Sequence, residues 1–213
     1  MKSLVKNLLA GTLAAVLLSA CSADETEIPA DSSNATAKST TSRFVIIPIT
    51  PMGAHVAQMG SPERRQIAAN LLQGFLIMRD YNTGVCYEVA AYLKYLYDNS
   101  ITCEDLSLYN GELWLHRFNF LQGRQWDGQT ALRAGEIIGF RYEHNQGFFH
   151  AAVGTGNDDE IRGVNGGRFG TGWQTPAHLK GLLGSPNPDG TFNYEGARIR
   201  VYLSNLGYEH QEL

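Results

Sequence analysis

Two apolar runs near the middle of the chain constrain its fold most. Residues 137–140 and Phe148–Gly154 are rich in β-branched, aromatic and small apolar side chains, and the turn formers Asn145 and Gly147 lie between them. This pattern predicts two strands joined by a turn. Apolar and polar residues alternate over Ala197–Leu203, which predicts a further, half-exposed strand. An antiparallel sheet is therefore expected in the C-terminal half.

Helical patterns precede these strands. Ser61, Pro62 and Glu63 form a typical helix start, with a capping residue, a proline and an acidic first turn. Apolar residues then recur at helical spacing at Ile67, Leu71, Leu72, Phe75 and Met78. A second helix is predicted from Cys86 to Asp98. The remaining predictions are strands over 44–49, 106–109, 112–120 and 161–164, and a short helix over 176–183. Together they give an α+β class, with N-terminal helices packed on an antiparallel sheet of about five to six strands.

The first 21 residues are typical of a secretory signal. Lys2 and Lys6 form a basic start, residues 8–18 form a short apolar core, and small residues lead to Cys21. This end resembles the bacterial lipobox, in which the cysteine is lipidated and becomes the mature N-terminus. An uncleaved membrane anchor is the alternative. Either interpretation predicts a protein of the cell envelope that is tethered to a membrane, which would be the outer membrane or periplasm of a Gram-negative cell.

Composition divides the rest of the chain into a linker and one domain. Residues 22–43 are mostly small, polar or acidic and predict a flexible linker, whereas residues 44–213 can form one folded domain. The net charge is −4 and no Lys/Arg cluster occurs, so a nucleic-acid partner is not expected. No histidine or acidic spacing typical of metal ligands and no phosphate-binding loop is found, so no cofactor is predicted. The sequence does not indicate an oligomeric state.

Cys86 and His150 are the residues that suggest a chemistry. Cys86 follows the turn 82–84 and opens a predicted helix, where the backbone N–H groups and the helix dipole favour a thiolate. His150 interrupts an otherwise apolar strand, where a buried imidazole is costly unless it is hydrogen-bonded or used. The pair predicts a nucleophile with a general base.

The remaining site residues are predicted from position. Asn165 ends a short apolar strand and can orient the imidazole, or it can simply form a turn with the next glycine. Asp158 and Asp159 are the competing candidates for that role. The backbone N–H of Cys86, with a side chain from the preceding turn such as Asn82 or Tyr81, would hold an oxyanion.

A structural interpretation of the same residues stays open. An exported protein invites a disulfide between Cys86 and Cys103, the second of which lies in a segment predicted as a polar loop. A helix over residues 86–98 is about 18 Å long. The two Cα atoms must nevertheless come within about 7 Å of each other for a disulfide. The alternative to a catalytic pair is a buried structural cysteine and a core histidine.

The motifs resemble the papain-like superfamily in its bacterial forms. Residues 84–87 open a helix with a cysteine, and residues 132–140 and 149–154 resemble the strand, gap and histidine strand of NlpC-type peptidases and CHAP amidases. Glu136 stands where those families usually have aspartate. The run 161–165, with Trp173 beyond it, also resembles papain-fold toxin domains.

This resemblance implies a papain-like fold and a cysteine peptidase or amidase. Cys86 would attack an amide carbonyl, His150 would accept and return the proton, and Asn165 would fix the tautomer. With a lipid anchor at Cys21, the expected partners are the membrane and a peptidoglycan peptide or protein substrate. Two alternatives remain: a papain-fold toxin that deamidates glutamine in a target protein, and a non-catalytic binding module.

Overall fold

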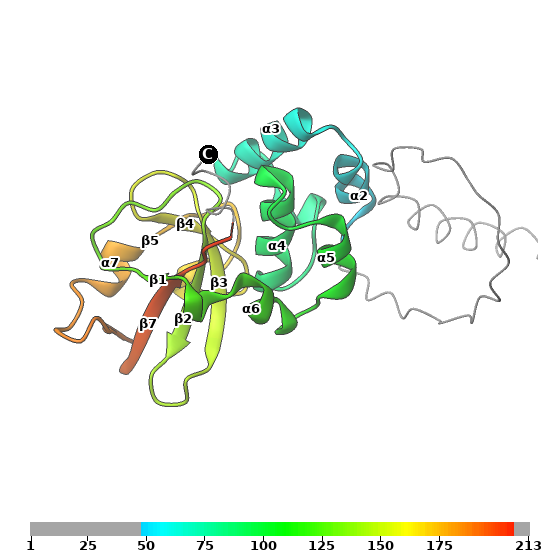
Figure 1. Ribbon diagram of the computed structural model, residues 1–213. Coiled ribbons are helices and arrows are strands. Elements are labelled where there is room, and N and C mark those ends of the chain that lie inside the picture. The colour runs from blue at the N-terminus through cyan, green and yellow to red at the C-terminus, as the bar shows by residue number, and fades with distance from the viewer. Residues whose placement is uncertain (1–47, 207–213) are drawn as a thin grey trace, which may run out of the picture.

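The structure is a computed structural model that describes residues 48–206 (Figure 1). The predicted signal segment with Cys21, the predicted linker and most of the strand predicted over 44–49 lie outside the described residues. Of that strand, Ile49 forms an isolated bridge with Asn82. Within residues 48–206 no helix is both long and apolar enough to cross a membrane.

Helices form one side of the molecule and a sheet forms the other, as Figure 1 shows. The central helix α4 (Cys86–Asp98) packs on strand β3 (Phe148–Gly154), and α3 (Ser61–Leu72) lies along α4. The helices of this layer are α2 (Pro51–Ala57), α3 (Ser61–Leu72), α4 (Cys86–Asp98), α5 (Cys103–Leu108) and α6 (Leu113–Phe118). The short helices are η2 (Met78–Asp80), η3 (Phe120–Gln122), η4 (Gly167–Phe169) and α7 (Leu179–Leu183).

The sheet is antiparallel throughout and has seven strands among the described residues, rather than five or six. Its order is β1-β7-β2-β3-β4-β5, and β6 pairs with β7. The strands are β1 (Arg124–Gln125), β2 (Ile137–Tyr142), β3 (Phe148–Gly154), β4 (Glu160–Arg162), β5 (Ala177–His178), β6 (Phe192–Tyr194) and β7 (Ala197–Leu203). The α+β class and the β2–β3 hairpin are confirmed.

The strands predicted over 106–109 and 112–120 were wrong, because both segments lie largely in helices. Thr102 and Asp105 cap α5 through reciprocal side-chain and backbone hydrogen bonds. In α6, Trp114 and Phe118 are four residues apart, are fully buried and stack on each other. Such spacing fits one face of a helix as well as one face of a strand, so periodicity alone could not separate the two.

Helix α3 begins as predicted but ends earlier. Its last residue is Leu72, and Gly74 has a φ of 77°, which lies in the left-handed region. Phe75 is consequently not on the inner face of a helix, and it is 77% exposed. Met78 is buried, but it belongs to η2.

Two apolar clusters lie on opposite faces of the sheet. On the helix side, Ile137, Ala151 and Val153 pack with the buried residues of α3, α4 and α6. On the other side, Ile138 and Ala152 pack with aromatic and aliphatic residues of the C-terminal half. The alternation along β2 and β3 therefore assigns each side chain to one of the two faces.

A bulge interrupts this alternation in β3. Phe140 pairs with His150, but the next residue, Arg141, pairs with Phe148, so Phe149 is an extra residue on the β3 side. A bulge shifts the facing of the residues on one side of it relative to those on the other. Phe148 consequently packs on the helix side, whereas His150 packs on Phe140 on the other side.

Candidate functional site

The turn before α4 places Cys86 at the helix N-terminus, as the sequence predicts. The side-chain oxygen of Asn82 accepts a hydrogen bond from the Gly84 N–H at 2.7 Å, and Glu88 accepts one from the Val85 N–H at 2.8 Å. A Cβ at Gly84 would overlap the Glu88 carboxylate. The glycine and the two side chains together form a tight, capped entry to the helix.

The Cys86 thiol is free and buried, with the residue 8% exposed. Burial raises its pKa, although backbone hydrogen bonds from the N–H groups of Ala151, Tyr87 and Cys86 itself act in the opposite direction. The expectation of a lowered pKa was therefore wrong, because desolvation of the sulfur outweighs the helix terminus. The disulfide alternative is also contradicted by the free thiol. Cys103 does not lie in a loop, but begins α5.

His150 is almost completely buried on the face of the sheet opposite α4. Its ring lies against Phe140, with centroids 5.6 Å apart, and against Phe169 at 6.4 Å. The Nε2–H donates to the Phe169 carbonyl at 3.3 Å, and Nδ1 has no hydrogen-bond partner within residues 48–206. Burial lowers the pKa of this imidazole to about 4, and the hydrogen bond to Phe169 offsets only part of that shift.

The structure does not bring the thiol and the imidazole together. Cys86 packs with Ala151 and Val153 in the helix-side cluster, whereas His150 packs on Phe140 and Phe169 in the other cluster. The two side chains thus lie on opposite faces of β3. The physical reason is the regular alternation along β3: Ala151 and Val153 face α4, so their neighbours His150 and Ala152 face the other side.

Asn165 forms a turn rather than a partner for the imidazole. It has a φ of 60°, in the left-handed region that asparagine tolerates, and Gly166 follows it. The loop covers His150 through its glycines: a Cβ at Gly166 would overlap the ring, and one at Gly163 would lie 3.0 Å from Nε2. The Asn-Gly turn, which the sequence left open, is the arrangement found.

The two aspartates that compete with Asn165 act on α7 and not on His150. Asp158 forms an ion pair with the Lys180 ammonium at 2.8 Å, and the Asp159 carboxylate accepts the Lys180 backbone N–H. Both are therefore structural in this arrangement, because they fix the turn between β3 and β4 to the start of α7.

The oxyanion candidates lie in the entry turn. Asn82 is 2% exposed, and its amide nitrogen has no hydrogen-bond partner among the described residues. The hydroxyl of Tyr81 has a raised pKa because of burial and the nearby Asp80 charge. The backbone N–H of Cys86 is directed to its own sulfur.

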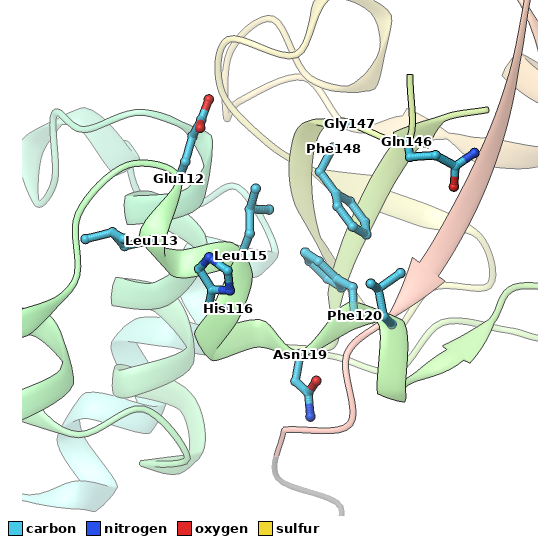
Figure 2. Close-up of a pocket in the computed structure, with 10 residues that line it drawn as sticks. Glu112, Leu113, Leu115, His116, Asn119, Phe120, Gln146, Gly147 and Phe148 are labelled. Carbon is cyan, nitrogen blue, oxygen red and sulfur yellow. The ribbon is translucent and has the colours of Figure 1, made fainter. Parts of the chain in front are cut away.

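Sequence reasoning missed a cleft between α6 and the β2–β3 hairpin (Figure 2). Its volume is about 560 Å³. The wall on one side comes from α6 and η3, and the other comes from the hairpin turn and the start of β3. The lining residues are Glu112, Leu113, Leu115, His116, Asn119, Phe120, Leu121, Gln146, Gly147 and Phe148. The mistaken strand over 112–120 hid this site, because a strand would not have presented these side chains on one helical surface.

No group of three or more metal-ligating side chains lies close together within residues 48–206. The comparisons with known proteins add no assignment: no family model matches the chain, and no curated protein matches it significantly. A papain-like relationship therefore stays a prediction from the motifs around Cys86 and His150.

Proposed function

We propose that this domain is a binding module of papain-like form that takes a peptide in the cleft between α6 and the β2–β3 hairpin. The observation that carries this proposal is the separation of Cys86 and His150 on opposite faces of β3. A general base must come within hydrogen-bond reach of the group that it deprotonates. In this arrangement the sheet lies between the Cys86 thiol and the His150 imidazole.

The protonation states support the same proposal. A thiol whose pKa is raised by burial is a poor source of thiolate at neutral pH. An imidazole with a pKa of about 4 is a weak base, and catalytic bases work best near the ambient pH. Neither group has the environment that nucleophilic catalysis requires.

The cleft has the properties of a ligand site. Its volume falls in the range of small-molecule and peptide pockets, and its lining combines apolar side chains with a few polar groups. Leu113 and Leu121 are 49% and 65% exposed in the free protein. With the proposed lipid anchor at Cys21, the domain would face ligands of the cell envelope, and a peptide of peptidoglycan or of an envelope protein would be the partner.

Binding without turnover tests this proposal. The purified full chain and its Cys86→Ala variant are titrated with peptidoglycan-derived and hydrophobic peptides by calorimetry, and the peptides are then analysed by mass spectrometry. We expect equal affinities for the two proteins and intact peptides after incubation. Cleavage or deamidation by the wild type that the variant cannot perform would overturn the proposal.

A thiol amidohydrolase is the second candidate, and one observation favours it. Three backbone N–H groups converge on the Cys86 sulfur, which is a preorganised site for a negative charge. Turnover of a peptide by the wild type that is lost in Cys86→Ala would support this candidate. Peptides left unchanged by both proteins would count against it.

A further inference from the structure

We propose that the cleft recognises an apolar side chain that is next to a cationic group, such as a lysine, an arginine or a free amino terminus in a peptide. This inference rests on the proposed function and names the chemistry of its ligand. Three features of the cleft support it: an apolar floor, the packing that holds this floor in place, and the negative charge of the lining.

The floor consists of two stacked aromatic rings. Phe120 and Phe148 have centroids 5.0 Å apart and an angle of 26° between their planes. Figure 2 shows both rings between the two walls, with Leu115 and His116 on the α6 side. Phe120 is only 1% exposed, so the half-buried Phe148 ring, supported by Phe120, presents the apolar surface, which suits a large aliphatic or aromatic side chain.

Packing beneath the floor holds it in place. Phe120 lies directly over Gly139 of β2, where a Cβ would come within 2.7 Å of the ring. Phe148 contacts Tyr202 of β7, with ring centroids 5.6 Å apart, and its backbone carbonyl accepts a hydrogen bond from Tyr87 at 3.4 Å. A floor fixed from below loses little conformational entropy when a ligand binds.

The charge of the cleft is negative. Among the described residues that line it, Glu112 is the only acidic one and none is a lysine or an arginine. The nearest basic residue in the sequence of α6, Arg117, is bound to the Asp105 carboxylate and the Ser100 carbonyl. Figure 2 places Glu112 at one end of the α6 wall and Asn119 at the other. Such a lining attracts a cationic group and repels an anionic one.

Three capped dipeptides test the inference: acetyl-Phe-Lys-amide, acetyl-Phe-Glu-amide and acetyl-Ala-Lys-amide. Each is titrated into the isotope-labelled full chain, and backbone amide shifts locate the site. We expect Phe-Lys to bind about tenfold more tightly than either of the others, since each lacks one of the two recognised groups. The shifts should centre on residues 112–121 and 146–148.

Matched variants separate charge from apolar contact. Glu112→Gln should remove most of the preference for Phe-Lys over Phe-Glu, whereas Glu104→Gln, on the exposed side of α5, should leave it unchanged. Leu121→Ala should weaken both Phe peptides severalfold. Leu108→Ala is the control, because Leu108 is 59% exposed and outside the cleft.

The outcomes distinguish the inference from the proposed function. Equal binding of Phe-Lys and Phe-Glu in the cleft overturns the charge assignment but leaves a peptide-binding module. Equal binding of Ala-Lys and Phe-Lys overturns the apolar assignment in the same way. If none of the three peptides, and no other peptide in the calorimetric panel, perturbs the cleft residues, both the inference and the proposed binding site are wrong.

Discussion

Phe140 lies directly opposite His150 in the β2–β3 ladder, and the two rings stack on the sheet face that points away from α4. This pairing fixes the imidazole in an apolar layer closed by Phe169, instead of beside the Cys86 thiol. A histidine in such a layer is neutral at physiological pH, since no carboxylate contributes to its pKa. The residue that looks most catalytic in the sequence thus belongs to the core.

Protonation of His150 should destabilise the fold in acid. Its pKa is lowered from 6.5 to about 4 on folding, so the unfolded chain binds the proton more readily between these values. The stabilisation is therefore complete above pH 6.5 and is lost as the pH falls towards 4. At pH 5 the loss should be about 2 kcal/mol.

Urea unfolding at pH 7.5 and pH 5 measures this loss. The difference between the free energies of unfolding at the two pH values should be about 2 kcal/mol smaller in His150→Phe than in the wild type. It should be unaffected in His144→Gln, because that side chain is exposed at the β2–β3 turn. The same difference in wild type and His150→Phe would show that His150 is not the titrating group.

Gly166 should not tolerate a side chain. A Cβ there overlaps the His150 ring, so Gly166→Ala should lower the free energy of unfolding by about 2 kcal/mol. Gly172→Ala is the matched control, since nothing lies within 4 Å of its Cβ position. The double variant His150→Ala, Gly166→Ala should be more stable than the sum of the single effects predicts. Additive effects would mean that the loop does not rest on the imidazole.

The sequence was sufficient where local chemistry decides the structure. The capped turn before Cys86, the β2–β3 hairpin and the alternation of β7 were all predicted from residue types and spacing. It was insufficient where periodicity does not separate two structures: neither the extra Phe149 in β3 nor the helical use of Trp114 and Phe118 has a distinct periodic signal. Cys86 lies at the start of α4 as predicted, whereas the His150 ring lies on Phe140 and not beside the thiol.

The Cys86 thiol should react slowly with alkylating agents. Its raised pKa and burial reduce both the thiolate fraction and access, so iodoacetamide should modify it more slowly than free cysteine at pH 7.5. The midpoint of its rate–pH profile should lie above that of free cysteine. The alkylation rate is measured from pH 6 to pH 10 by quenching the reaction at intervals and quantifying the modified protein by mass spectrometry. The Cys86→Ser variant serves as the control for modification elsewhere. A rate above that of free cysteine at neutral pH would favour the hydrolase.

Arg162 should be the most sensitive charged residue in the fold. Its guanidinium donates to the carbonyls of Leu72 and Trp173 at 2.7 Å, Gln174 at 2.9 Å and Gln73 at 3.2 Å, and thereby joins the end of α3 to the loop after β4. Arg162→Met should cost about 3 kcal/mol, because several carbonyls lose their donors in a buried site.

Lysine cannot reproduce this fork of donors, so Arg162→Lys should recover only part of the stability. Arg65→Met is the matched control, since the Arg65 side chain makes one hydrogen bond, to the Tyr97 carbonyl, at an exposed position. Its effect on urea unfolding should stay within about 0.5 kcal/mol. Comparable losses in the two methionine variants would show that the contacts of Arg162 do not hold α3 and the loop together.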